Sequence, residues 1–146
     1  MSKLQIRQGL FETNSSTTHT ITMANKSEYD AWNKGEVLFN LDEEKFLPVE
    51  QAIEENIKIL SKSNDCEGEE FEKFIKTYRE TKSISDALSI MEKPPFDESD
   101  IDWYELYLWG DDYYERLCEY YETYTKEFTT ENGDTVVAFG YYGNDY

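Results

Sequence analysis

Hydrophobic and polar residues alternate near the amino end of the chain. Residues 3–11 follow a period of two, and farther on His19, Ile21 and Met23 share one face with threonines between them. This period is typical of strands that have one buried face. The polar residues 13–18 between the two segments favour a turn. The sequence therefore predicts an N-terminal β-hairpin.

A second hairpin is predicted at the carboxyl end. Residues 127–130 and 135–142 flank Asn132 and Gly133, a dipeptide that strongly favours a tight connection between antiparallel strands. A shorter apolar run over residues 36–41 predicts one more strand in the middle of the chain.

The central part of the chain follows the helical period of 3.6 residues. Apolar residues recur three, four, eight and eleven positions after Val49, which predicts a long helix over residues 49–60. Similar patterns predict three shorter helices, over residues 27–35, 71–78 and 84–91. We expect one α+β domain over residues 1–146, in which a mainly antiparallel sheet of two hairpins and the middle strand is covered by four to five helices.

The segment after Gly110 carries two further periodicities. Asp111, Glu115, Glu119 and Glu122 are separated by four, four and three residues, so on a helix they would share one stripe. Leu117 and tyrosines 113, 120, 121 and 124 likewise mark one helical face. The sequence thus predicts another helix here, with an ordered row of carboxylates.

The charge of this segment bears on its function. The chain has 32 acidic and 14 basic residues, with a formal net charge of −18. Its last third is both the most acidic and the most aromatic part, whereas a disordered acidic tail would be poor in aromatic residues. We therefore expect this segment to fold. So acidic a protein would repel the phosphates of nucleic acid rather than bind them.

A row of carboxylates about 6 Å apart has a spacing comparable to that of the phosphates along one DNA strand. Such a row could occupy the basic groove of a nucleic-acid-binding protein, and exposed aromatic rings could stack on its arginines. We therefore predict a non-enzymatic binding protein of this kind, with a solvated acidic face over a tyrosine core as the alternative. The expected contact residues are Asp100, Asp102, Trp103, Trp109, Asp111, Asp112, Glu115, Glu119 and Glu122.

The polar loop before His19 is a second candidate site. Its side chains of interest, together with a nearby arginine, are Arg7, Glu12, Asn14, Ser15, Ser16 and His19. A hydroxyl activated by His19 is compatible with a small hydrolase or transferase, and the loop could also bind an anion. A structural turn explains the same residues. A structural or assembly accessory protein is a third possible role.

Other kinds of site find little support in the sequence. Cys66 and Cys118 do not form a C-x-x-C motif and suit free thiols in a reducing compartment. With one histidine they offer too few ligands for a zinc site, and no glycine-rich phosphate-binding motif is present. No apolar run approaches the ~20 residues of a membrane span, and no secretory signal opens the chain. We expect no cofactor, no metal and a cytoplasmic location.

Three strings of residues resemble small proteins of bacteriophages and prophages. They are I-R-Q-G-L-F-E-T-N-S-S-T-T-H-T-I (residues 6–21), W-N-K-G-E-V-L-F-N (residues 32–40) and G-D-T-V-V-A-F-G-Y-Y-G (residues 133–143), about a quarter of the chain. In that group the loop reads N-S-S-S-T-H, so Thr17 departs from the pattern. The resemblance brings no activity with it. It implies a phage product acting in the host cytoplasm, and hence an inhibitor of host defence such as an anti-restriction or anti-CRISPR protein.

Overall fold

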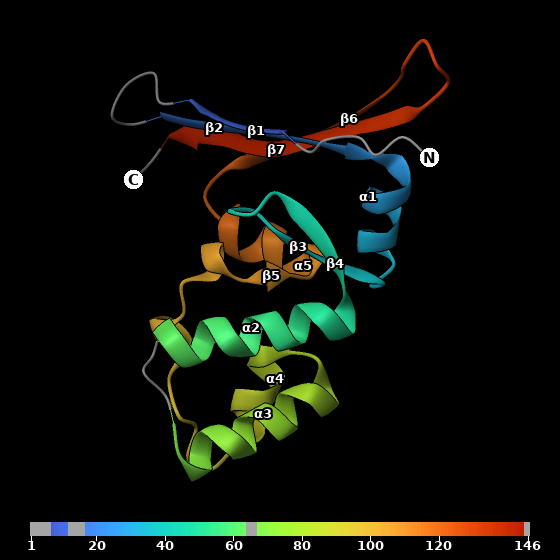
Figure 1. Cartoon of the computed structure of the whole chain (residues 1–146). Helices are drawn as coiled ribbons and strands as arrows, with labels where there is room; N and C mark the ends of the chain where they lie inside the picture. The colour runs from blue at the N-terminus through green and yellow to red at the C-terminus, as the bar shows by residue number, and fades with distance from the viewer. Residues whose placement is uncertain (1–6, 12–16, 64–66, 145–146) are drawn as a thin grey trace.

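Two antiparallel sheets organise the chain, in a computed structural model that describes residues 7–11, 17–63 and 67–144. The four-stranded sheet has the order β1 (Arg7–Phe11), β2 (Thr17–Asn25), β7 (Thr135–Asn144) and β6 (Glu122–Thr129). The three-stranded sheet has the order β4 (Lys45–Pro48), β3 (Val37–Asn40) and β5 (Tyr107–Leu108). The described helices lie on one side of the four-stranded sheet (Figure 1), which confirms an α+β fold.

The predicted helices of the central chain are confirmed, with small shifts at their ends. The α-helices are α1 (Lys26–Asn33), α2 (Val49–Ser63), α3 (Glu69–Thr81), α4 (Ile84–Ile90) and the single turn α5 (Gly110–Asp112). Shorter elements are the 3₁₀ turns η1 (Glu98–Asp100) and η2 (Trp103–Glu105) and the π-helical turn η3 (Tyr113–Leu117). Ser83 caps α4 by accepting a hydrogen bond from the Asp86 N–H at 3.2 Å.

Both predicted hairpins are present, and they join through their inner strands. β1 pairs with β2, β2 with β7, and β7 with β6, all antiparallel. Gly133 has a φ of +87° in the last loop, and its N–H donates to the Thr130 carbonyl at 2.9 Å. Such a loop of three residues with a left-handed glycine is common in hairpins.

The middle strand belongs to a different sheet from the one we expected. β3 pairs with β4 on one side and β5 on the other, and the sequence analysis had found neither of these partners. The Asn40 Oδ1 accepts a hydrogen bond from the Glu43 N–H at 2.7 Å, which closes the loop between β3 and β4. Asparagine makes this local turn readily, so it was the available sequence signal.

The helix predicted after Gly110 is present only as far as Leu117, and its continuation to residue 124 is wrong. A regular helix ends at Asp112, η3 follows, and the Tyr121 N–H donates to the Cys118 carbonyl at 3.0 Å in a turn that leads into β6. From Glu122 to Lys126, threonine and larger residues alternate, as in a strand. Pairing with β7 along the whole of β6 supplies the backbone hydrogen bonds, whereas a helix would have placed like charges four residues apart.

The inner face of β2 carries threonines rather than the larger apolar residues. Thr20, Thr22 and Ala24 are buried, while His19 on the opposite face is exposed. The alternation was predicted, and the structure buries the threonine face rather than the face that carries His19. The core side is filled by β7 and η3 instead, where Phe139 and Tyr113 are fully buried.

Trp32 of α1 joins the two sheets at the centre of the core. Its ring lies 5.5 Å from that of Phe39 on β3, 5.4 Å from Phe139 on β7 and 5.3 Å from Tyr113 on η3. The indole N–H donates to the Leu108 carbonyl at 2.9 Å, so the buried polar group is satisfied. Trp32 thus fixes the positions of β5 and η3, and predicted contact residues lie next to both elements in the sequence.

Candidate acidic interaction surface

Four carboxylates from two separate segments form a first acidic cluster. Asp42 and Glu43 lie in the β3–β4 loop, and Asp102 and Glu105 lie at the two ends of η2. All four residues are exposed. Partial burial raises the pKa of Asp42, and repulsion from Asp102, Glu105 and Glu43 raises it further. The structure therefore brings together charges that lie about sixty residues apart in the sequence.

A buried asparagine holds the two segments of this cluster together. Besides accepting from the β3–β4 loop, Asn40 donates through Nδ2 to the Glu105 carbonyl at 2.8 Å. The Asp102 carboxylate caps η2 by accepting from the Tyr104 N–H at 3.1 Å. Glu105 accepts a hydrogen bond from the Ser63 hydroxyl at 3.0 Å. Asn40 thus fixes the backbone of both segments, and the carboxylates of Asp102 and Glu105 have hydrogen-bond donors of their own.

A shallow groove of about 440 Å³ runs beside this cluster. It is lined by Asn40, Asp42, Glu43, Lys45, Glu55, Ile59, Lys62, Ser63, Glu105 and Tyr107. Acidic side chains outnumber lysines in this lining, so the groove is a poor site for an anion. No group of histidine, cysteine and carboxylate side chains within the described ranges has the arrangement needed for a metal ion.

A second acidic cluster surrounds Arg116. It consists of Asp111, Asp112 and Glu115, and burial raises the pKa of Asp112 although Arg116 opposes the shift. The Arg116 Nε lies 3.5 Å from Asp112 Oδ1, and its Nη2 lies 3.3 Å from Glu98 Oε1. One arginine therefore compensates this cluster only in part.

Trp103 connects the two clusters. The Arg116 guanidinium carbon lies 4.0 Å from the centre of the Trp103 ring, and Trp103 directly follows Asp102. We expected Trp103 to stack on an arginine of a partner, but the ring is half-buried and already carries a cation of its own chain. Trp103 thus packs against Arg116 of the second cluster and directly follows Asp102 of the first.

The four remaining predicted contact residues belong to neither cluster. Trp109 is directed inward, with its indole N–H donating to the Lys82 carbonyl at 2.9 Å. Asp100 accepts from the Asp97 N–H at 3.4 Å, and Glu122 accepts from the Tyr142 hydroxyl at 2.7 Å. Glu119 is exposed in the turn before β6. Asp111, Glu115, Glu119 and Glu122 therefore do not form the straight helical row that we predicted.

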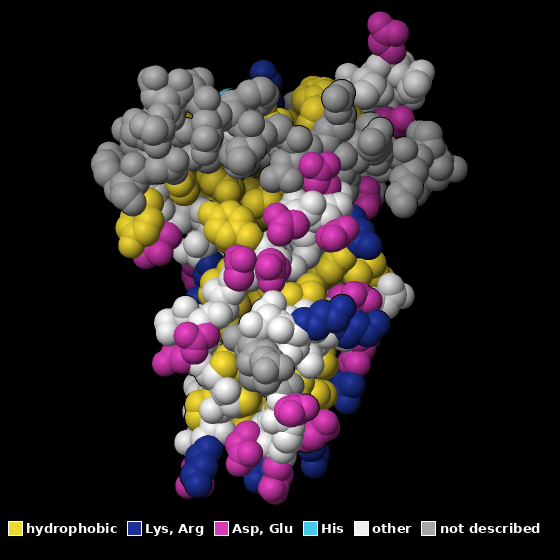
Figure 2. Space-filling model, turned by 60° about the vertical axis from the view of Figure 1, so that its left-hand side comes forward, with side chains coloured by type: hydrophobic (Ala, Val, Ile, Leu, Met, Phe, Trp, Pro, Cys, Tyr) yellow, Lys and Arg dark blue, Asp and Glu magenta, His cyan; other side chains and the backbone are white. Residues whose placement is uncertain are grey.

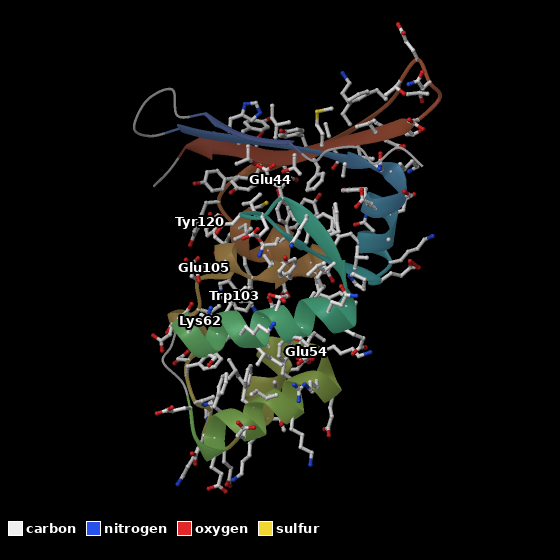
Figure 3. The ribbon with its side chains drawn as sticks, in the orientation of Figure 1. Glu44, Glu54, Lys62, Trp103, Glu105 and Tyr120 are labelled. Carbon is white, nitrogen blue, oxygen red and sulfur yellow. The ribbon has the colours of Figure 1, made fainter. Side chains whose placement is uncertain are left out.

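Exposed aromatic residues accompany the acidic clusters. Tyr120 is 74% and Tyr104 42% exposed. Figure 3 places Glu44, Tyr120, Glu105, Trp103 and Lys62 along the same side of the molecule. When that side is turned forward in Figure 2, acidic side chains gather at mid-height, with hydrophobic side chains exposed beside them. This face, which we call the acidic face, combines the two clusters with Tyr104 and Tyr120.

The second candidate site is described only in part. Glu12, Asn14, Ser15 and Ser16 lie outside the described residues, as does the side chain of Arg7. His19 is exposed on the outer face of the four-stranded sheet, where its ring lies 5.8 Å from that of Tyr124 and 6.0 Å from that of Tyr142. A Ser/Thr–His catalytic site here stays a prediction from the sequence.

The Cys118 thiol is buried beside Tyr113. Its desolvation raises the pKa to about 12, so the nucleophilic thiolate is scarce at neutral pH. This environment depends on the packing of η3 against the sheet, so no local pattern around Cys118 indicates it.

Comparisons with known proteins give no functional information. The chain matches no protein-family model, no curated protein and no solved structure. Among the described residues, no helix combines the length and the apolar composition that crossing a bilayer requires. A functional proposal therefore has to rest on the chemistry of the acidic face.

Proposed function

We propose that this chain is an acidic binding protein that occupies the basic nucleic-acid-binding surface of another protein. The observation that carries the proposal is the pair of acidic clusters, which are linked through Trp103 and Arg116. The first cluster contains four carboxylates from two segments; partial burial raises the pKa of Asp42, and repulsion from the other three raises it further. A protein retains such repulsion at a stability cost, which an oppositely charged partner would relieve.

The geometry changes the form of the mimicry that we expected. The carboxylates lie in the β3–β4 loop and at η2 and η3, and not along one helix. A cationic groove senses the field of such a surface at distances up to the Debye length, about 8 Å at physiological ionic strength. Association should therefore be fast and should weaken as salt increases.

Exposed tyrosines suit the same partner. Tyr104 and Tyr120 both lie on the acidic face, and Tyr104 also interacts with the Tyr141 side chain. Tyrosine and arginine are enriched among the residues that dominate binding energy at interfaces. A phenol ring beside a carboxylate offers an arginine both a stacking surface and an ionic partner.

The resemblance of the chain ends to phage proteins suggests the setting. We propose a phage product that acts in the cytoplasm of the host, on a restriction, CRISPR or DNA-metabolism protein. No observation on the described residues favours catalysis at His19 or a role in phage assembly over this proposal.

Charge reversal in matched pairs tests the proposal. Asp42→Lys with Glu43→Lys removes half of the first cluster, while Glu70→Lys with Glu80→Lys makes the same change on exposed positions of α3. The immobilised chain is used to capture proteins from a bacterial lysate, and a captured protein is then purified. Its binding to labelled duplex DNA is measured by fluorescence anisotropy as the chain is added.

We expect the wild-type chain and the α3 variant to displace DNA from the captured protein, and the loop variant to do so much more weakly. Displacement should also fade between 0.1 M and 1 M salt, as the Debye length shrinks from about 10 Å to about 3 Å. DNA that stays bound at saturating wild-type chain would refute the proposal, as would equal competition by both variants.

A further inference from the structure

The strand β6 forms one edge of the four-stranded sheet. It pairs with β7 without interruption, from Glu122 opposite Tyr142 to Thr129 opposite Thr135. Along the described part of the chain, no strand pairs with its other edge. Apart from the half-buried Tyr124, every residue of β6 is exposed. β6 contains neither proline nor a bulge, two of the devices that natural proteins use to block an open edge.

The residues of β6 are self-complementary about Tyr124. The strand reads Glu122-Thr123-Tyr124-Thr125-Lys126, so equal steps to either side reach two threonines and then two opposite charges. Glu122, Tyr124 and Lys126 share the outer face, because Glu122 lies opposite Tyr142 and bonds its hydroxyl on that face. The threonines share the inner face.

We infer that β6 is a homodimer interface, in which two copies pair antiparallel about a two-fold axis at Tyr124. In that register Glu122 lies opposite Lys126 of the second copy, twice. Thr123 lies opposite Thr125 of the second copy, also twice, and the backbone of Tyr124 lies opposite its own copy at the axis. Opposite charges and paired threonines are cross-strand combinations that stabilise antiparallel sheets. The two four-stranded sheets become one continuous sheet of eight strands.

The contacts that Glu122 and Lys126 make within the chain leave both side chains able to pair with a second copy. Glu122 accepts one hydrogen bond, from the Tyr142 hydroxyl, and its second oxygen can accept another. Within the described ranges no carboxylate forms an ion pair with Lys126. Lys126 is one of only two basic residues after position 95. Because Lys126 lies four residues after Glu122 on the exposed edge, the two ends of the pairing segment carry opposite charges.

The arrangement of Tyr124 supports a flat edge. Its ring lies across Gly140 on β7, and its hydroxyl donates to the Thr20 carbonyl on β2. A side chain at position 140 would collide with both of these groups. The ring is therefore held over its own sheet, and it leaves the open edge of β6 clear for a second strand.

This inference does not rest on the proposed function, since it concerns a different surface. The acidic clusters belong to the β3–β4 loop, η2 and η3, and the dimer uses the outer edge of β6. A monomeric chain could still displace DNA, and a dimeric chain could fail to do so. The two proposals can thus fail separately.

The mass of the full chain in solution tests the dimer. Sedimentation velocity is measured over a hundredfold range of concentration at physiological ionic strength, where the Debye length of about 8 Å screens the repulsion between two acidic copies. Lys126→Glu places glutamates opposite each other at both ends of the pairing. The double variant Glu122→Lys with Lys126→Glu restores opposite charges with their signs exchanged. Lys93→Glu, exposed beyond α4, is the control for the added negative charge.

We expect the wild-type chain and Lys93→Glu to double in mass as concentration rises. Lys126→Glu should weaken the dimer by about tenfold or more, and the double variant should recover it. Circular dichroism checks that each variant is folded, and Glu122→Lys alone, which opposes two lysines, repeats the test with the other sign. The inference is overturned by a wild-type chain that stays monomeric throughout. It is equally overturned if Lys126→Glu dimerises like the wild type, or if the double variant recovers nothing.

Discussion

Asn56 holds the short strand β5 against α2, and its removal should have the largest effect on stability of any polar substitution in the core. Its side chain is fully buried. The amide oxygen accepts from the Tyr107 N–H at 2.7 Å, and the amide nitrogen donates to the Tyr107 carbonyl at 2.9 Å and to the Tyr78 hydroxyl at 2.9 Å. The amide thus replaces a neighbouring strand on the edge of β5 that β3 does not cover.

The expected cost of Asn56→Ala follows from the groups that lose their partner. The N–H and the carbonyl of Tyr107 would both be buried and unpaired, at about 1–3 kcal/mol for each group. We therefore expect a loss of about 4 kcal/mol in the free energy of unfolding. For a chain of this length, 1 kcal/mol shifts the Tm by about 2–4 °C, so the Tm should fall by roughly 12 °C.

Urea unfolding followed by circular dichroism measures this change, with Gln51→Ala as the control. Gln51 carries the same amide group on the exposed face of α2, and its replacement should change the free energy by less than about 0.5 kcal/mol. Tyr78→Phe and the double variant complete a cycle that separates the Tyr78 hydrogen bond from those to Tyr107. A loss below about 1 kcal/mol for Asn56→Ala would show that β5 does not depend on this amide.

Three other predictions concern the sheet and the surface charges. Gly140→Ala should lower the free energy of unfolding by about 2–3 kcal/mol, because the new methyl group meets the β2 backbone; Gly110→Ala, which makes only ordinary contacts, should be nearly neutral by the same denaturant titration. The pKa of Asp42 is raised in the folded state, so its charge opposes folding at neutral pH. Asp42→Asn should therefore raise the Tm at pH 7. Thermal scans at falling pH should show this gain vanish once the carboxyl is protonated in both the folded and the unfolded state. The pKa of Glu54 is lowered chiefly by its paired hydrogen bonds with Arg79, at 2.9 and 2.7 Å. Glu54→Gln should therefore lower the free energy of unfolding by about 0.5 kcal/mol at pH 7 on this exposed surface. Because that stabilisation is lost as pH falls, the wild type and the variant should unfold with the same free energy at pH values below the folded pKa of Glu54.

The acidic face and the β6 edge lie on different parts of the fold and obey different chemistry. The acidic face depends on long-range charge, which salt screens. The β6 edge depends on backbone hydrogen bonds and on pairs of side chains that meet directly. A dimer through β6 would present two acidic faces to a partner, and so raise its apparent affinity through a second contact.

Local sequence patterns determined most of the secondary structure. The apolar period of residues 49–60 predicts α2, and the alternation at both ends predicts the hairpins that build the four-stranded sheet. These features depend on residues within a few positions of each other, so the local backbone preferences and the hydrophobic pattern agree. Helix ends are also local: the Ser83 cap at the start of α4 depends on residues within the same turn.

Surface ion pairs follow the helical spacing only in part. Glu69 and Lys73 pair along α3 as their spacing indicates. Glu54 and Lys58 have the same spacing on α2, but Glu54 forms its paired hydrogen bonds with Arg79 of α3 instead. A spacing of four residues permits an ion pair within a helix. A neighbouring helix, whose position the sequence does not reveal, can offer an arginine with better geometry.

Tertiary packing decided the features on which function depends. It turned residues 122–129 into a strand, because β7 offered a partner along their whole length, and this removed the predicted row of carboxylates. It also joined the β3–β4 loop to η2 through Asn40, which created an acidic cluster that no local pattern contains. Periodicity records which residues share a face of one element. Which elements meet is determined by the burial of the whole core, and the charges that gather on the surface follow from that arrangement.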